Sequence, residues 1–362
     1  MAAMSTETKK VILAMSGGVD SSVAAKLLLE AGYEVTGVFL CMGPAGASDG
    51  DSRGCCSPQD AADARRVAQK LGIDLHVLEV AELFGGIVDD FAAEYARGRT
   101  PNPCIHCNTR IKFGRLMDLA DSLGIRYVAT GHHARTAEVG GQAAILRARD
   151  RRKDQSYALF GIAAESLARI LLPIGEVDDK LAVRSIARSL GLNVHDKPDS
   201  QEICFAPDND YVEVLRERAP EALRPGAIID SSGQVLGQHD GYGRFTIGQR
   251  RGLRVAAGVP MYVTRIDPDT AAVTIGPRAE VQTQRLQASS TNWHCDVPAE
   301  FDATVQIRYN HSGAPSRVRL CEDGSMEVLF EEPVTAVTPG QAAVVYDGDR
   351  LLGGGWIDDS GS

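Results

Sequence analysis

Residues 11–22, with the sequence VILAMSGGVDSS, constrain the fold more than any other stretch of the chain. The five apolar residues 11–15 are too few for a buried helix and predict a short interior strand of a parallel sheet. The turn 16–18 contains two glycines, which permit positive φ angles and a close approach of the backbone to a ligand. Polar residues 20–22 suit the first turn of a helix that ends near Gly32. The stretch therefore predicts a strand, a glycine-rich turn and a helix.

This turn is a candidate anion site. The helix N-terminus and the glycine-rich turn direct free backbone N–H groups, and the positive end of the helix dipole, at one point. The string S-G-G-x-D-S lacks the Gly-Lys-Ser/Thr ending of a Walker loop, so a P-loop kinase is not indicated. It resembles the pyrophosphate loop of the N-type ATP pyrophosphatases, which bind ATP and adenylate a carbonyl oxygen with release of pyrophosphate. The alternative, a glycine-rich turn without a ligand, is disfavoured by the length of the match.

Strands and helices alternate through the first half of the chain. Further strands are expected at 33–41, 73–80 and 126–130, and helices at 58–71, at about 83–97, at about 109–123 and within 170–190. This alternation predicts an α/β fold with a doubly wound parallel sheet. Ligands of such sheets bind beyond the carboxyl ends of the strands, which is where residues 16–22, Leu40 and Gly131 fall.

The sequence pattern changes after about Glu217. Short β-like runs alternate with Gly and Pro turns and predict a small β domain, and a second β-rich unit from about Leu286 predicts a compact barrel. We therefore expect three domains: residues 1–217, the α/β domain with a helical extension; residues 218–285, a small central β domain; and residues 286–362, a C-terminal β-barrel.

Composition limits the compartment and the partners. No run approaches the ~20 apolar residues of a membrane span. Lys9 and Lys10 precede only five apolar residues, a run too short for a signal peptide, so we expect a cytoplasmic protein without a membrane contact.

The net charge of −10 argues against indiscriminate nucleic-acid binding. Basic residues nevertheless gather in three groups, within 147–153, within 97–115 around a Cys motif, and at Arg244, Arg250, Arg251 and Arg254. Each group is either a nucleic-acid contact or ordinary solvated surface charge.

The cysteines are too few and too clustered for a disulfide framework; there are eight in 362 residues. Cys104 and Cys107 form a C-x-x-C pair, and Cys204 follows about a hundred residues later. A structural zinc site normally needs a second close pair, which is missing. Two roles stay open: an iron–sulfur cluster with one open iron, or a sulfur carrier with a resolving thiol. The vicinal pair Cys55 and Cys56 receives no role.

A series of motifs runs in order along almost the whole chain: SGGVDSS, TPNPCIHCN followed by IKFG, TGHHAR, KDQSYAL, KPDSQEICF, FTIGQRRGL and PVTAVTPGQ. In this order they resemble the bacterial tRNA 2-thiouridylase family, which thiolates the wobble uridine of certain tRNAs. The pyrophosphate loop alone is shared with argininosuccinate, asparagine and GMP synthetases. An amidating synthetase has no use for the distant cysteines or for the β-rich second half.

The resemblance implies roles for individual residues. ATP would be bound by Ala14, Met15, Ser16, Gly17, Gly18, Val19, Asp20, Ser21, Leu40 and Gly131. Cys107 matches the family's nucleophile position, and Cys204 matches the position that carries a persulfide. Residues at positions that contact tRNA are Asn102 and Pro103, which border the target base, and His132, Lys153, Asp154, Gln155, Arg308, Tyr309 and Gln341. One departure is Cys104, where many members have Asp; it makes a [4Fe-4S] cluster on Cys104, Cys107 and Cys204 an alternative carrier of the sulfur.

The implied chemistry needs these residue types. ATP, with Mg²⁺, adenylates the poorly electrophilic C2 oxygen of uridine, and a persulfide then replaces AMP by sulfur. The expected partners are the anticodon stem-loop of tRNA and a sulfur donor protein such as a cysteine desulfurase or a relay protein. We also expect Arg151, Arg152 and Lys153 to contact the RNA backbone. A non-catalytic protein that binds RNA and metal is the alternative of another class.

Overall fold

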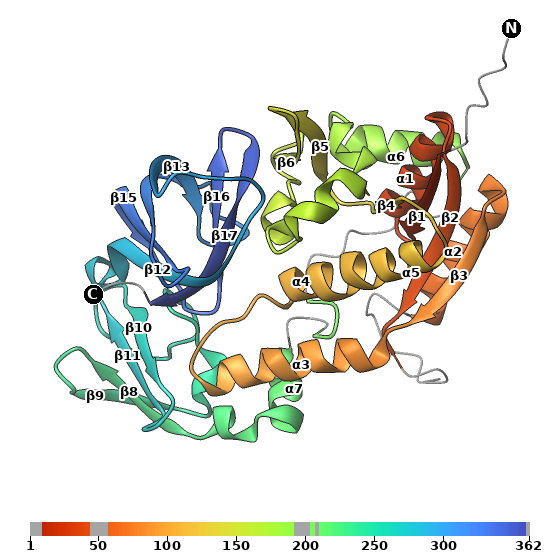
Figure 1. Cartoon of the computed structure of the whole chain (residues 1–362). Coiled ribbons are helices and arrows are strands. Elements are labelled where there is room, and N and C mark those ends of the chain that lie inside the picture. Colours follow the sequence, from red (N-terminus) through yellow and green to blue (C-terminus); the bar gives the residue numbers. More distant parts are fainter. Residues whose placement is uncertain (1–8, 44–56, 192–202, 207–209, 360–362) are drawn as a thin grey trace, which may run out of the picture. The chain divides into compact units, whose positions relative to one another are not determined.

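The structure is a computed structural model that describes residues 9–43, 57–191, 203–206 and 210–359 (Figure 1). The chain divides into two compact units. Unit 1 comprises residues 1–85, 105–207 and 349–351, and unit 2 comprises residues 86–104, 208–348 and 352–362. Cys55 and Cys56 lie outside the described residues.

Unit 1 is built on a five-stranded sheet with the order β3-β2-β1-β4-β7. Its strands are β1 (Lys10–Ala14), β2 (Glu34–Cys41), β3 (Asp74–Glu79), β4 (Tyr127–Ala129) and β7 (Ile170–Leu171). Every pair of neighbours is parallel. The chain runs outward from β1 to β3 and then returns to the other side of β1 with β4. The predicted doubly wound sheet is thus confirmed, and its strand order reverses at β1, where such sheets bind their ligands.

Helices cover both faces of this sheet. On one face α1 (Val19–Glu30) packs against α2 (Pro58–Leu71) and α6 (Lys180–Ser189), and their apolar residues bury Val11 and Leu13 of β1. Ile12 is also fully buried but points to the opposite face. There α5 (Leu116–Ser122) contacts β1 and β4.

Helix α2 has the predicted bounds, 58–71, and local sequence sets both of its ends. Ser57 forms a capping box with Asp60, and the C-cap Gly72 takes the left-handed conformation with φ 68°.

Several elements differ from the sequence prediction. The helix expected from about residue 109 begins earlier, with α4 (Pro103–His106), and continues as a π-helix, η1 (Cys107–Arg115), into α5. Residues 170–190 are not one helical region, because β7 and the 3₁₀ helix η4 (Pro173–Glu176) precede α6.

A hairpin of β5 (Ala134–Val139) and β6 (Gln142–Arg147) was not predicted, and the 3₁₀ helices η2 (Ser156–Leu159) and η3 (Ala164–Arg169) follow it. Helix α3 (Ala81–Ala96) matches its prediction within two residues at its start and one at its end.

Unit 2 contains a four-stranded sheet with the order β10-β11-β8-β9. Its strands are β8 (Gly226–Asp230), β9 (Val235–His239), β10 (Tyr262–Asp267) and β11 (Ala272–Gly276). Short helices α7 (Tyr211–Arg218), η6 (Pro220–Leu223) and η7 (Tyr242–Arg244) flank it, and η8 (Arg278–Val281) leads to the next sheet. This sheet is the small β domain that the sequence predicts.

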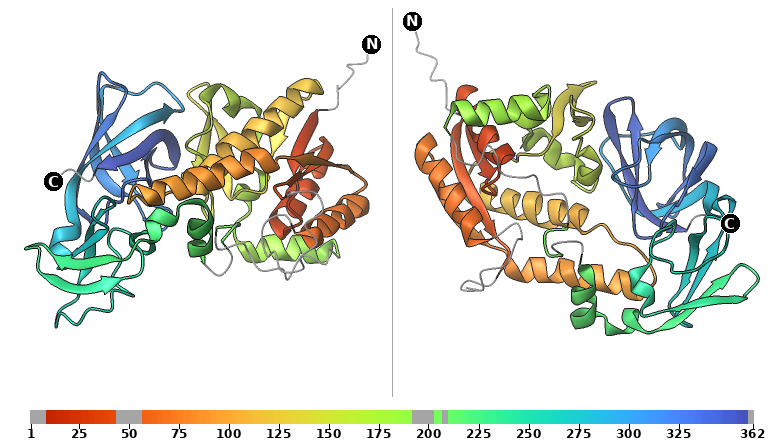
Figure 2. Two further views of the ribbon diagram at one scale, coloured as in Figure 1. Left: turned by 90° about the horizontal axis from the view of Figure 1, so that it is seen from below. Right: turned by 180° about the vertical axis from the view of Figure 1, so that it is seen from behind.

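The remaining strands of unit 2 form a closed antiparallel barrel (Figure 2). They are β12 (Gln282–Trp293), β13 (Glu300–Gln306), β14 (Ala314–Leu320), β15 (Met326–Thr335), β16 (Ala342–Asp347) and β17 (Arg350–Asp359). Pairing of β12 with β17 closes the barrel, and Val305, Val328 and Phe330 are buried in its core. The predicted barrel is confirmed. In the part of the chain that the structure describes, no helix combines the length and the apolar character needed to cross a membrane.

Candidate functional site

The turn between β1 and α1 is held together by its own serines. Ser16 N donates to Ser21 Oγ at 3.3 Å, and Ser21 Oγ donates to Gly18 O at 3.2 Å. Ser22 Oγ donates to the same carbonyl at 2.7 Å. Gly18 is the N-cap of α1 and has no side chain to satisfy the first amides of the helix. The geometry therefore suits an anion, as the sequence predicts.

Two glycines fit this turn against its surroundings. Gly17 has φ 71°, and a Cβ there would lie 2.2 Å from Asp60 O at the start of α2. A Cβ on Gly131, just after β4, would lie 2.7 Å from Ser21 N. The structure thus brings the turn and Gly131 together at the carboxyl end of the sheet. Leu40, near the end of β2, is buried.

Asp20, in the first turn of α1, carries a charge that the fold compensates. Lys180 Nζ donates to its two carboxylate oxygens at 2.6 and 2.7 Å. His133 Nε2 lies 3.2 Å from Oδ1, although it is not aligned as a hydrogen-bond donor. Burial raises the pKa of Asp20, but the contacts with His133 and Lys180 outweigh burial and hold that pKa below its ordinary value of 3.8. Asp20 is therefore an ionised carboxylate in a nearly neutral cluster.

The sequence motifs identify neither Lys180 nor His133 as a partner of Asp20. Lys180 is the first residue of α6, 160 positions after Asp20, and no local pattern distinguishes it from other lysines.

His132, His133 and Gln155 form a group of polar side chains close to the turn. His132 is buried, with its Nδ1 2.7 Å from Thr130 Oγ1 and its ring stacked on Phe113 at 6.0 Å. Burial, together with the charge of Lys112, lowers the pKa of His132 well below 6.5, so the ring is neutral. Gln155 Oε1 accepts from His133 N at 2.9 Å, and Gln155 N donates to His133 O at 2.7 Å. Gln155 thereby positions the histidine that faces Asp20.

Cys107 starts the π-helix η1 and is buried, with 8% of its surface exposed. π-Helical turns are rare and occur frequently at functional sites. Next to it, Asn108 Nδ2 donates to Ala158 O at 3.0 Å, whereas the buried Asn108 Oδ1 has no partner among the described residues. Cys104, one turn earlier, is exposed. The two members of the C-x-x-C motif thus differ in environment.

Cys204 is half-buried in the short segment 203–206 of unit 1, the unit that also contains Cys107 and the turn 16–18. Phe205 packs edge-on against Phe84 of α3, with ring centroids 5.8 Å apart. Within the residues that the structure describes, no group of three His, Cys, Asp or Glu side chains is arranged to hold a metal ion. The described residues therefore give no support to a [4Fe-4S] cluster on the three cysteines.

Comparisons with known proteins identify the family. Residues 9–208 match the model "tRNA methyl transferase HUP domain", residues 212–277 the model "tRNA methyl transferase PRC-barrel domain", and residues 283–357 the model "Aminomethyltransferase beta-barrel domain". The tRNA-specific 2-thiouridylase MnmA of Carboxydothermus hydrogenoformans is 50% identical over 97% of this chain and 98% of that protein. MnmA of Rhodopirellula baltica is 48% identical over 96% of each chain. The chain belongs to the MnmA family.

A solved structure is also similar, but distantly. A 4-thiouridine synthetase in complex with RNA and bound ATP matches with a TM-score of 0.37 and 19% identity, over 59% of this chain and 51% of that chain. A likeness this weak adds nothing to the assignment to MnmA.

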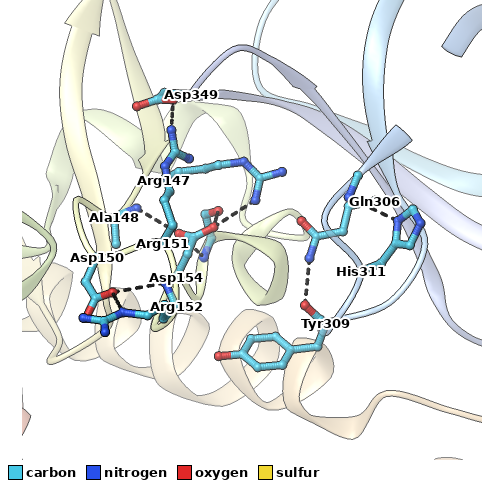
Figure 3. A network of polar contacts seen from close by, with 12 residues as sticks. Arg147, Ala148, Asp150, Arg151, Arg152, Asp154, Gln306, Tyr309, His311 and Asp349 are labelled. Atoms are coloured by element: carbon cyan, nitrogen blue, oxygen red, sulfur yellow. Dashed lines mark hydrogen bonds and ion pairs between the residues drawn. The ribbon is translucent and has the colours of Figure 1, made fainter. Parts of the chain in front are cut away.

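The residues expected to contact tRNA, from the resemblance to the MnmA family, differ in their surroundings. Asp154 accepts hydrogen bonds from Arg147 Nη1 at 3.0 Å, Ala148 N at 2.9 Å and Ser156 Oγ at 2.8 Å, so it stabilises its own loop (Figure 3). Arg151 pairs with Asp349, and Arg152 with Asp150 at 2.9 Å. The positive charges of this run are thus largely balanced within unit 1; Lys153 is half-buried beside them.

In unit 2, Gln341 Nε2 donates to Thr100 O at 2.9 Å and to Pro101 O at 3.1 Å, and so positions the segment that contains Asn102 and Pro103. Asn102 is half-buried and Pro103 is buried.

The pair Arg308 and Tyr309 follows β13 at the rim of the barrel. Arg308 Nη1 donates to Thr335 O at 3.0 Å. The side chain of Tyr309 is exposed, and its carbonyl accepts from Gln306 Nε2 at 2.9 Å (Figure 3). These contacts fix the backbone and leave the Tyr309 ring accessible.

Proposed function

We propose that this protein is an ATP-dependent tRNA 2-thiouridine synthase, a sulfurtransferase that replaces the C2 oxygen of the wobble uridine by sulfur. The observation that carries the proposal is the identity of 50% with a tRNA-specific 2-thiouridylase over 97% of the chain. The geometry of the turn 16–18 supports it, because the open amides of α1 suit a phosphate.

In this proposal the turn and the first residues of α1 bind the phosphates of ATP. A lone carboxylate at Asp20 would repel them, and its pairing with Lys180 and His133 removes most of that repulsion. Gly17 and Gly131 allow the turn to pack closely against its protein neighbours, and Gly18 leaves the start of α1 without a side chain that could cover its first amides. Mg²⁺ that accompanies ATP takes most of its ligands from phosphate oxygens and water, so it needs no protein cage.

The uridine reacts first as a nucleophile and then as an electrophile. Its C2 oxygen attacks the α-phosphorus of ATP, and pyrophosphate leaves. Backbone N–H groups of the turn stabilise the charge that develops on the phosphates. The uracil base is presented by an anticodon loop, where it is already single-stranded, so removing it from its stack costs only a few kcal/mol. Asn102 and Pro103 would border it.

Sulfur then replaces AMP at C2, with Cys204 as the persulfide carrier and Cys107 as the second thiol. In one route the terminal persulfide sulfur attacks C2 and AMP leaves; the Cys107 thiolate then attacks the Cys204 sulfur, breaking the S–S bond and leaving sulfur on the base. In the other route Cys107 attacks first and releases hydrosulfide, which attacks C2. Both routes form a disulfide between Cys107 and Cys204, which an external dithiol reduces.

The alternatives gain no support from the structure. The iron–sulfur alternative lacks a metal-binding group of three His, Cys, Asp or Glu side chains among the described residues. A non-catalytic protein that binds RNA would have no need for the compensated Asp20. The sulfur donor, a cysteine desulfurase or a relay protein, and the cytoplasmic location belong to this proposal.

The decisive experiment measures 2-thiouridine in tRNA together with tRNA-dependent release of pyrophosphate, in the presence of ATP, cysteine, a desulfurase and a dithiol. We expect Cys107→Ser and Cys204→Ser each to lower 2-thiouridine formation at least ~100-fold, since each removes a reacting thiol. Pyrophosphate release in the first turnover should persist, because adenylation precedes sulfur transfer.

Cys321→Ser is the matched control. Cys321 is half-buried in unit 2 and has no part in the reaction, so both readouts should stay at the wild-type level. Full 2-thiouridine formation by either of the other two variants would contradict the assigned roles. Absence of 2-thiouridine with the wild-type protein would contradict the function itself.

A further inference from the structure

An arginine-rich loop in unit 2, residues 245–261, has no role in the proposal above. The loop, hereafter the arginine loop, joins η7 to β10, and its arginines Arg250, Arg251 and Arg254 are exposed. No acidic residue lies between Asp240 and Asp267, in a chain whose net charge is −10. Positive charge is therefore concentrated here without a balancing charge from the same segment.

These arginines differ from the other basic residues in their pairing. Arg147, Arg151 and Arg152 of unit 1 all form ion pairs with carboxylates. In the part of the chain that the structure describes, Arg250, Arg251 and Arg254 form none. An unpaired guanidinium keeps its donors available for an anion and loses no existing partner when it binds one.

Hydrogen bonds fix the first part of the arginine loop, residues 246–251, before any ligand arrives. Gln249 bridges it, since Thr246 N donates to Gln249 Oε1 at 3.1 Å and Gln249 Nε2 donates to Arg251 O at 3.0 Å. Gly248 N donates to Val263 O at 2.8 Å, and Val263 N donates to Gln249 O at 3.0 Å. This preorganisation lowers the entropy lost on binding.

The loop also lines an open pocket of about 440 Å³. Arg250 and Arg254 line it together with Leu253, Val255, Val259 and Met261. Val259 is 61% exposed, which is high for an apolar side chain in a loop fixed at its base. The volume lies within the ~300–1,000 Å³ of small-molecule sites, so the pocket has room for one nucleoside.

We propose that the arginine loop is a second RNA-binding surface for the tRNA substrate, apart from the residues that border the target base. Backbone phosphates contact Arg250, Arg251 and Arg254, and the ribose or base of one nucleotide packs on Val255 and Val259. This inference rests on the proposed function, which supplies tRNA as the ligand.

Two observations favour RNA over an acidic protein. Guanidinium groups bind phosphates and carboxylates alike through two parallel hydrogen bonds, but the apolar pocket beside these arginines fits the uncharged part of a nucleotide. The loop also begins beside the segment that contains Asn102, since Thr246 Oγ1 lies 3.3 Å from Thr100 Oγ1 within unit 2.

The test compares tRNA binding by the full chain over a range of KCl concentrations. In the variant Arg250→Gln/Arg251→Gln/Arg254→Gln we expect the affinity to fall at least ~10-fold, and the slope of log K against log [KCl] to become shallower by about two to three. Val259→Glu, which places a negative charge in the pocket while every arginine stays, should also weaken binding at least ~10-fold.

The control variant Arg216→Gln/Arg317→Gln/Arg319→Gln removes the same charge from exposed arginines of unit 2 that already form ion pairs. Its salt slope should match the wild type. Melting temperatures establish that each variant is folded, and ATP binding without tRNA should be unchanged in all three.

The outcomes separate this inference from the proposed function. A wild-type slope for the arginine-loop variant, with 2-thiouridine still formed, overturns the RNA-binding role and leaves the function intact. Unchanged tRNA binding combined with slower sulfur delivery from the donor protein would assign the loop to that protein instead. A wild-type protein that neither binds nor thiolates tRNA overturns the function itself.

Discussion

At the scale of single residues, the site depends on charges that are buried and compensated. Asp20 is mostly buried, and burial alone would favour its neutral acid form. Lys180 from α6 and His133 from the segment after β4 reverse that preference. The result is an ionised carboxylate that adds little net negative charge where phosphates are expected. The sequence predicts Asp20 from its motif but neither partner, because both come from distant parts of the chain.

His132 makes stability depend on pH. Its pKa lies well below 6.5 in the folded chain because the ring is buried, whereas in the unfolded chain it gains a proton below about 6.5. The unfolded state therefore binds more protons below that pH. The free energy of unfolding then falls by up to ~1.4 kcal/mol for each unit by which the pH decreases, until the pKa of the folded state is reached. We expect the melting temperature to fall more between pH 7 and pH 5.5 for the wild type than for His132→Gln.

His76→Gln provides the comparison for this experiment, because His76 is an exposed histidine of β3 in the same unit. Its melting temperature should follow the wild type at each pH. Equal pH dependence in the wild type and His132→Gln would show that His132 is not the titrating group.

At the scale of elements, the turn 16–18 depends on contact with α2. Gly17 and Gly72 share the left-handed conformation, with φ 71° and 68°, but a Cβ on Gly17 would collide with Asp60 O, whereas a Cβ on Gly72 meets nothing within 4 Å. Ala at either position costs about 1 kcal/mol of backbone strain. We expect Gly17→Ala to weaken ATP binding at least ~10-fold in calorimetric titration, because the turn must move to relieve the collision.

Gly72→Ala is the matched substitution, since it brings the same strain without the collision. Its ATP affinity should remain within about twofold of the wild type, while its melting temperature falls slightly. Equal ATP affinities for the two variants would show that the fit of the turn against α2 does not shape the phosphate site.

The sequence predicts elements well where the pattern is local. The strand before the turn, the capping box at Ser57 and the glycine after α2 all follow from short-range rules. The π-helix at Cys107 does not follow from such rules, and its Thr109 packs closely against Gly161, which is distant in the sequence. The hairpin β5–β6 was missed because its second strand runs into a basic segment, 147–153, that reads as polar surface.

At the scale of the whole molecule, the succession of strand-like and helix-like segments along the chain predicts the architecture. It indicates the parallel sheet, the small β domain and the barrel, all of which the structure contains. It does not predict which arginines lack an ion-pair partner within the fold and so stay available to bind an anion. The chain has a net charge of −10, yet arginines of segment 147–153 are paired within the fold and those of the arginine loop are not. The sequence alone does not separate these two cases, because a partner can be close, as Asp150 is to Arg152, or distant, as Asp349 is to Arg151.

The central claim is that Cys107 and Cys204 act together in one sulfur transfer. Its most direct test is a single turnover with persulfide-loaded protein, ATP and tRNA in the absence of any dithiol, followed by peptide mapping with mass spectrometry. Both routes of sulfur transfer end in the same bond, so we predict one disulfide between Cys107 and Cys204 for each 2-thiouridine formed. Formation of 2-thiouridine while both thiols remain reduced would contradict the account.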